Sequence, residues 1–205
     1  MPSPRTRRLL LDHQTLTARL ANWPLIQITG TAGLPPEIYR FTYNIRGLYV
    51  SPNGEILERA VHVLEVNLSL GYPRRAPQCR MLTPVFHPNF DDAMVCIGDF
   101  WAAAEGLDDL IIRIGRMIAY QEYNTKSPLN GLAAKWAAQN PHLLPVDSRP
   151  VAPPLEPEAP EAQTPEPAPE AAPPPQPEPK LTASAAAGAD DVDGVDPWEH
   201  KIVIS

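Results

Sequence analysis

The sequence predicts an α+β fold, in which an antiparallel sheet is flanked by helices and followed by a disordered tail. Apolar residues recur at helical spacing near the N-terminus and again after residue 107, whereas strand-like alternation fills residues 25–82. From residue 150 to residue 180, 13 of 31 residues are proline. We therefore expect a folded domain over residues 1–147, a Pro/Ala/Glu-rich disordered linker over residues 148–189, and a C-terminal peptide over residues 190–205.

The first predicted element is an amphipathic helix from Arg5 to Ala21. Ser3 is a suitable N-cap, and Pro4 suits the first helical position. Leu9 and Leu16 then fall on one side of the helix. This side is expected to pack on the sheet.

The central region predicts a four-stranded antiparallel meander. In the third strand, Leu64, Val66, Leu68 and Leu70 alternate with polar residues, so one face is expected to be buried. Asn53-Gly54 favours a tight hairpin turn before this strand. The predicted strands are Leu25–Thr29, Ile38–Tyr49, Val61–Leu70 and Gln78–Leu82.

Two helices are predicted after the meander. Apolar residues between Leu107 and Ile118 recur every three or four positions, after an acidic start at Asp108 and Asp109 that suits a helix N-terminus. A shorter helix is expected over Leu129–Gln139, ended by Pro141. The second helix is apolar enough to cover the sheet.

Charge and composition argue against some kinds of binding partner. Residues 1–149 hold 15 Lys and Arg against 13 Asp and Glu, whereas residues 150–205 hold 2 against 11. The folded part has no clustered basic face, which argues against nucleic acid, and no apolar run approaches the length of a membrane span. With two cysteines and no recognisable secretory leader, we expect free thiols and a cytoplasmic location.

The stretch from Tyr72 to Asp99 is the candidate functional loop. It contains both cysteines, several prolines and the triplet His87-Pro88-Asn89. Cys96 follows Asn89 by seven residues, beyond a polar turn, so a thiol is expected beside a rigid loop. Cys79 falls within a predicted strand and is expected to be a buried structural residue.

The ordered motifs resemble those of the ubiquitin-conjugating enzymes, the UBC fold. The resemblance covers roughly residues 5–144. It rests on Tyr72-Pro73, Pro77, the run Thr83–Asn89, Val95-Cys96, Trp101, Asn124 and Ser127-Pro128-Leu129-Asn130. The resemblance implies an N-terminal helix, a four-stranded meander, an active-site loop and two C-terminal helices.

The resemblance also implies roles for individual residues. Cys96 is expected to hold a ubiquitin-like modifier as a thioester, because a thiol is both a nucleophile and a good leaving group. Asn89 either stabilises the oxyanion or braces the loop, and His87 holds the loop by hydrogen bonds. Asn124 is expected to lie across the active-site groove from Cys96. Ser127 either gates the acceptor amine or caps the following helix.

The chain departs from the family pattern around the site. The segments before and after Cys96 are short, Arg74 follows the Tyr-Pro pair, and three alanines follow Trp101. The last two features lie on the surface that recruits RING-type ligases in the family, so a conventional RING partner is not expected. After Pro145 a proline-rich segment replaces the last helices of the family. This truncated form resembles bacterial conjugating enzymes of Bil-type operons, several of which serve in antiphage defence.

The predicted function is that of a conjugating enzyme with neither metal nor small cofactor. Its expected partners are an activating enzyme, a ubiquitin-like modifier and a protein substrate. Arg5, Arg7 and Arg8 form either a solvated face or the docking surface for the activating enzyme. Trp198 and Ile202 mark a C-terminal peptide that could dock on another subunit.

Two other functions remain open from the sequence. One is a non-catalytic binding module with the same fold, which would hold a modifier or partner without forming a thioester. The other is a Cys-His hydrolase that uses Cys96 with His87 or His62, although no third, orienting group is recognisable.

Overall fold

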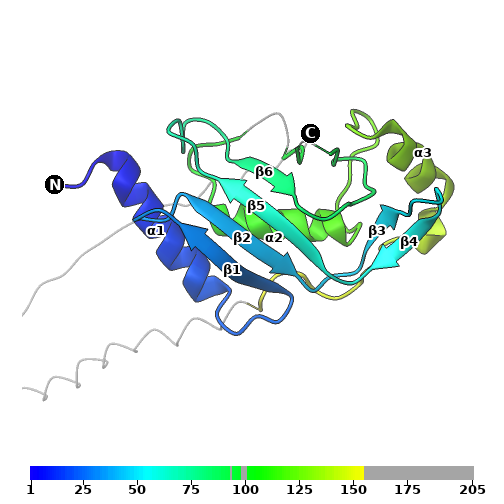
Figure 1. The fold of residues 1–205 in the computed structure, drawn as a ribbon, viewed down its shortest axis with the longest axis horizontal. Helices are drawn as coiled ribbons and strands as arrows, with labels where there is room; N and C mark the ends of the chain where they lie inside the picture. Colours follow the sequence, from blue (N-terminus) through cyan, green and yellow to red (C-terminus); the bar gives the residue numbers. More distant parts are fainter. Residues whose placement is uncertain (93, 98–100, 155–205) are drawn as a thin grey trace, which may run out of the picture. The chain divides into compact units, whose positions relative to one another are not determined.

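The computed structural model describes residues 1–92, 94–97 and 101–154 (Figure 1). The predicted C-terminal peptide, with Trp198 and Ile202, and most of the predicted linker lie outside these residues. In chain order the elements are α1 (Pro4–Arg19), β1 (Ile26–Ala32), β2 (Ile38–Tyr43), β3 (Gly47–Val50), β4 (Ile56–Arg59), β5 (His62–Asn67), β6 (Gln78–Met81), α2 (Leu107–Ile118), α3 (Gly131–Gln139) and a 3-10 turn, η1 (Pro141–Leu143).

The predicted start of α1 is confirmed. The Ser3 hydroxyl accepts a hydrogen bond from the Thr6 N–H at 3.1 Å, and Pro4 is the first helical residue. Leu9 and Leu16 are buried in the main core. The helix therefore follows the local signals that the sequence carries.

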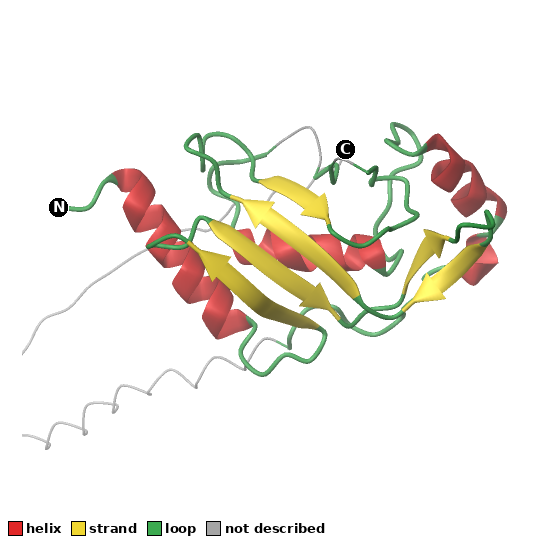
Figure 2. Ribbon diagram, in the orientation of Figure 1, coloured by secondary structure: helices red, strands yellow, loops and turns green. Residues whose placement is uncertain are grey.

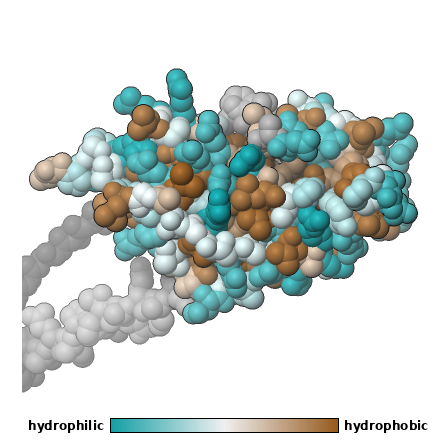
Figure 3. Space-filling model, in the orientation of Figure 1, coloured by the Kyte–Doolittle hydropathy of each residue, from teal (hydrophilic) through white to brown (hydrophobic). Residues whose placement is uncertain are grey.

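The predicted four-stranded antiparallel sheet is present, in the order β1-β2-β5-β6. α2 lies behind this sheet and α1 runs past β1 (Figure 1). The face turned away from α2 is polar, since Arg40 and Arg80 each form an ion pair with Glu65, at 3.1 and 3.6 Å. Figure 3 shows this face as a mixture of hydrophilic and hydrophobic groups. The sheet thus buries one face only.

The prediction of one strand from Ile38 to Tyr49 is wrong. The segment forms β2 and β3, which belong to different sheets, and β3 pairs with β4 in a two-stranded sheet (Figure 2). A Cβ atom at Gly47 would lie 2.8 Å from Ile118 and 2.9 Å from His62. Glycine therefore allows the backbone to leave the first sheet across a closely packed surface. The predicted Asn53-Gly54 turn closes the β3–β4 hairpin, with Gly54 at a φ of +82°.

The predicted third strand is also too long. β5 ends at Asn67, and the Tyr72 N–H closes a turn on the Ser69 carbonyl at 2.9 Å. Because the alternation of a strand stops at this turn, Leu70 is 87% exposed although it was expected to be buried.

A second core joins the β3–β4 hairpin to α3. It contains Leu48 from β3, Tyr120 after α2, Ala133 and Ala137 from α3, and Val146 from the following segment.

None of the described helices is long and apolar enough to span a membrane.

Buried contacts continue beyond residue 147, the predicted end of the domain. We call residues 147–151 the strap. Asp147 accepts a hydrogen bond from the Arg46 N–H at 2.9 Å, and Arg149 holds the pKa of this carboxyl well below its usual range. Val151 is 2% exposed in the main core, and its carbonyl accepts a hydrogen bond from the Trp23 indole at 2.9 Å. The domain boundary stays a prediction, but packed residues reach at least Val151.

We expect Val151→Ala to lower the free energy of unfolding by about 1.5 to 3 kcal/mol, because it leaves a cavity against α2. Val151 fills this space closely, since a Cβ atom at Gly115 would lie 2.7 Å from it. Urea unfolding measures the change. The exposed neighbour Ser148 provides the control, and equal stability of Val151→Ala and Ser148→Ala would show that the strap does not contribute.

Candidate active site

Cys96 lies on a short hairpin that packs against the edge of β6. Phe90 and Val95 form an antiparallel bridge and are both buried. The Val95 N–H donates to the Cys79 carbonyl at 3.0 Å, and the Cys96 N–H donates to the Asn89 carbonyl at 2.8 Å. Cys96 itself is half-buried. The thiol is therefore held on a fixed backbone next to Asn89.

His87 is fully buried and joins two loops. Its Nδ1 accepts a hydrogen bond from the Asn89 N–H at 3.0 Å, which assigns the proton to Nε2, and Nε2 donates to the Glu122 carbonyl at 3.2 Å. Burial lowers the pKa of His87 to about 3. With a neutral ring and both nitrogens engaged, His87 holds the loop and is not placed to act as a base.

Asn89 connects the Cys96 hairpin to the loop after α2. Its side chain is 7% exposed, and its Oδ1 accepts a hydrogen bond from the Asn124 N–H at 2.9 Å. Its Nδ2 forms no hydrogen bond with any residue that the structure describes. The geometry thus includes both a bracing acceptor and an uncommitted amide donor beside the Cys96 backbone.

Asn124 organises the turn that carries Ser127. Its Oδ1 accepts hydrogen bonds from the N–H groups of Lys126 at 2.9 Å and Ser127 at 3.4 Å. The alternative that Ser127 caps the next helix is wrong, because the N-cap of α3 is Asn130, whose side chain accepts from the Ala133 N–H. Ser127 is exposed and is linked to Asn89 through Asn124.

The family of the chain follows from the sequence match over this region. A family model described as ubiquitin-conjugating enzyme matches residues 34–144. The chain belongs to the ubiquitin-conjugating enzyme family. It is 28% identical over 125 residues to "Ubiquitin-conjugating enzyme E2 N" of Drosophila melanogaster, with 58% of this chain and 78% of the relative covered. These findings imply a transferase.

Solved structures agree on the fold. S. cerevisiae Ubc12 matches with a TM-score of 0.51 and 22% identity over 67% of this chain and 72% of that one. A second structure, titled "Novel Ubiquitin-Conjugating Enzyme", matches with a TM-score of 0.50 and 18% identity over 67% of this chain and 87% of the other. At these identities the likeness shows the UBC-like fold alone.

Sequence reasoning missed two residues that hold this family member's site together. Tyr120 has a left-handed φ of 58°, donates its hydroxyl to the Phe86 carbonyl at 2.8 Å and packs on the His87 ring at 4.5 Å. The Asn130 N–H donates to the Pro88 carbonyl at 3.0 Å. A tyrosine that follows an apolar helix gave no signal of these contacts, since they depend on how the segments after α2 and before α3 meet the loop.

The arginines of α1 have different environments. Arg8 forms an ion pair with Asp12 at 2.8 Å and donates to the Tyr72 hydroxyl and to the carbonyls of Ala103 and Glu105. Arg5 forms an ion pair with Glu37 at 2.7 Å, whereas Arg7 is exposed. A docking role for the three stays a prediction, and only Arg7 among them is exposed, with its guanidinium donating to the Pro2 carbonyl at 3.4 Å.

The segment after Cys96 is held from α2. Arg113 donates to the Ile97 carbonyl at 2.8 Å and forms an ion pair with Glu105 at 3.0 Å. The Trp101 indole donates to the Pro73 carbonyl at 2.6 Å. These contacts fix the described residues on either side of positions 98–100.

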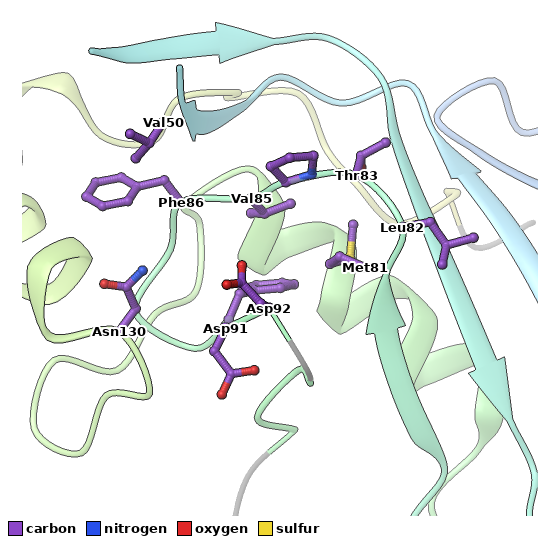
Figure 4. Close-up of a pocket in the computed structure, with 11 residues that line it drawn as sticks. Val50, Met81, Leu82, Thr83, Val85, Phe86, Asp91, Asp92 and Asn130 are labelled. Atoms are coloured by element: carbon purple, nitrogen blue, oxygen red, sulfur yellow. The ribbon is translucent and has the colours of Figure 1, made fainter. Parts of the chain in front are cut away.

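A groove of about 360 Å³ lies beside the Cys96 hairpin (Figure 4). Asp91 and Asp92 line it from the hairpin turn, and Asn130 lines it from the start of α3. No described residues form a cluster of three His, Cys, Asp or Glu side chains that could bind a metal ion. The remaining lining residues are Val50, Met81, Leu82, Thr83, Pro84, Val85, Phe86 and Phe90.

The two buried histidines make stability depend on pH. Burial lowers the pKa of His62 from 6.5 to about 4 and that of His87 from 6.5 to about 3. Because the folded state favours the neutral rings, their contribution is complete above pH 6.5 and is lost as the pH falls toward 4 and then 3.

We therefore expect the urea concentration at the midpoint of unfolding to decrease as the pH is lowered from about 7 to about 5.5. This pH range lies above the one in which ordinary carboxyls titrate. The exposed His142 provides the control, and His142→Gln is expected to keep this dependence. A midpoint that stays constant over this range would contradict the neutral, buried state of the two rings.

His62 gives no support to a Cys-His hydrolase. Its Nε2 donates to the Arg59 carbonyl at 3.0 Å and the ring packs against Gly47, on the side of the sheet where β3 begins. His87, the other candidate base, has both ring nitrogens engaged. Neither ring is arranged to activate Cys96.

Proposed function

We propose that this chain accepts a ubiquitin-like modifier as a thioester on Cys96 and transfers it to a lysine amine of a protein target. The observation that carries the proposal is the pairing of the Cys96 N–H with the Asn89 carbonyl, next to the uncommitted Asn89 amide. Membership of the ubiquitin-conjugating enzyme family supports the same reaction.

Each proposed step uses groups of this chain. The Cys96 thiolate attacks the C-terminal carbonyl of the modifier, a C–S bond forms, and the bond that joined this carbonyl to the activating enzyme breaks. A neutral amine then attacks the thioester carbonyl, and the Asn89 Nδ2, which no described residue engages, donates to the oxyanion that forms. The C–S bond breaks, the amine loses its proton to solvent, and Cys96 leaves as a thiolate.

The proposed partners are an activating enzyme that uses ATP, the modifier and the target protein. We place this reaction in the cytoplasm of a bacterium, in an antiphage conjugation system of the Bil type. The proline-rich sequence after Pro145, where the family has its last helices, and the short segments around Cys96 support this placement. Sequencing the neighbouring genes tests it, because an activating enzyme, a modifier and an isopeptidase are expected beside this gene.

The C-terminal peptide is proposed to dock on another subunit, with the linker raising its local concentration. Since Val151 is packed in the main core, the test deletes residues 155–205 and leaves the strap intact. We expect weaker binding to the activating enzyme and normal charging at high enzyme concentration. Unchanged affinity in a binding titration would remove this role.

Discharge of the charged chain tests the proposed transfer. We expect free lysine to remove the modifier from Cys96 and to yield a lysine–modifier amide in proportion, measured by mass spectrometry. If the chain binds the modifier but never carries it covalently, a non-catalytic binding module is the correct description.

A further inference from the structure

Lysine is scarce in this chain, which contains 4 lysines against 13 arginines. The described residues include only two of the lysines, Lys126 and Lys135. This distinction matters for an enzyme that modifies amines, because a guanidinium stays protonated and cannot act as an acceptor. The folded part therefore offers few side chains on which the enzyme could act upon itself.

One of these two lysines is placed beside the candidate active site. The Lys126 N–H donates to the Asn124 Oδ1, and the Asn124 N–H donates to the Asn89 Oδ1, at 2.9 Å in each case. Asn89 in turn accepts from the Cys96 N–H at 2.8 Å. A chain of three hydrogen bonds therefore connects the backbone of Lys126 to that of Cys96.

The Lys126 side chain is available for reaction. Lys126 is exposed and forms no ion pair with any residue in the described part of the chain. The hydrogen-bonded path from Lys126 to Cys96 passes through Asn124 and Asn89, and a lysine side chain extends about 6 Å beyond its Cα. Because the backbone N–H of Lys126 holds the Asn124 turn, its side chain can change conformation without breaking that turn.

Lys135 differs in its attachment. It is also exposed, but it lies in the middle of α3, whose backbone is fixed by helical hydrogen bonds. No described hydrogen bond links it to Asn89 or Asn124. It is therefore a matched comparison of the same residue type in the same domain.

We propose that Lys126 is a self-modification site, to which Cys96 transfers its own thioester-bound modifier. This inference rests on the proposed function. The neutral Lys126 Nζ attacks the thioester carbonyl, a C–N bond forms, the C–S bond breaks, Cys96 leaves as a thiolate, and the proton of the amine passes to solvent. The product is an isopeptide bond, and no further reactant is required.

The test uses the full chain and ubiquitin that carries a C-terminal alkyl thioester as the probe. Such a thioester exchanges with an accessible thiol, so no activating enzyme is needed. After charging, a thiol reductant separates the reducible thioester from a resistant isopeptide adduct, and peptide mass spectrometry locates the adduct. Lys126→Arg keeps the backbone hydrogen bond to Asn124, and Lys135→Arg is the control.

We expect a resistant adduct on Lys126 that falls about tenfold in Lys126→Arg, because proximity to the thioester drives the reaction, and changes little in Lys135→Arg. Cys96→Ala is expected to lack it. An adduct that forms equally without Lys126, or a stable thioester that yields none, would overturn this inference and leave the proposed function intact. Failure of Cys96 to form the thioester would instead overturn the proposed function.

Discussion

Cys96→Ala is expected to abolish the thiol-sensitive adduct between this chain and its modifier, because the other cysteine, Cys79, is buried. Cys96→Ser is expected to form an adduct that survives thiol reductants, since an oxygen ester replaces the thioester and is a poorer acyl donor. Both results are measured on non-reducing and reducing gels after incubation with the activating enzyme, the modifier and ATP.

The matched control for Cys96 is Cys79, the other cysteine of the chain. Cys79 is 5% exposed on β6, and burial raises the pKa of its thiol to about 12, so it is not present as a thiolate near neutral pH. We expect Cys79→Ala to charge normally, with a modest loss of stability from the cavity. A thiol-sensitive adduct on the Cys96→Ala chain would place the reaction elsewhere.

Asn89→Ala is expected to slow transfer from the charged enzyme by about 100-fold, the usual effect of removing a donor to an oxyanion. Charging of Cys96 is expected to change much less, because the Cys96 N–H pairs with the Asn89 carbonyl, which alanine retains. Single-turnover discharge to free lysine measures the transfer step separately from charging.

Asn89→Asp separates the two roles of this side chain. It keeps an oxygen that can accept from the Asn124 N–H but replaces the Nδ2 donor with a second oxygen. If Asn89 supplies the oxyanion donor, we expect Asn89→Asp to be at least as slow as Asn89→Ala. If it only braces the loop, discharge by Asn89→Asp should stay close to that of the unmodified chain.

Local signals made much of the fold predictable. Ser3 and Pro4 set the start of α1, and Gly54 set the hairpin turn, because each acts through its own backbone geometry. Alternation in β5 gave its buried face, with Leu64 and Val66 in the core. Such features need no information about distant parts of the chain.

The failures concern residues whose state depends on distant contacts. The break between β2 and β3 follows the close packing of Gly47 against Ile118 and His62, which are remote in sequence. Val151 was assigned to a disordered linker because of its proline-rich neighbours, yet it fills the core beside Gly115. Composition describes the average of a segment and does not reveal one anchored residue.

The candidate site was predictable at the level of motifs and not of contacts. The triplet and the following cysteine identified Asn89 and Cys96, and the structure brings their backbones together. The motifs left Ser127 with two possible roles. The cap at Asn130 excludes the capping role, and the gating role stays a prediction. Sequence reasoning also treated Arg8 as surface charge, whereas Arg8 joins α1 to the segment after Trp101.

The most direct test of the central claim is the intact mass of the chain after incubation with the activating enzyme, the modifier and ATP, followed by peptide mapping under non-reducing conditions. We expect one modifier per chain, attached to the peptide that contains Cys96 and released by a thiol reductant. A chain that binds both partners and keeps its unmodified mass would contradict the assignment of Cys96 as the thioester site.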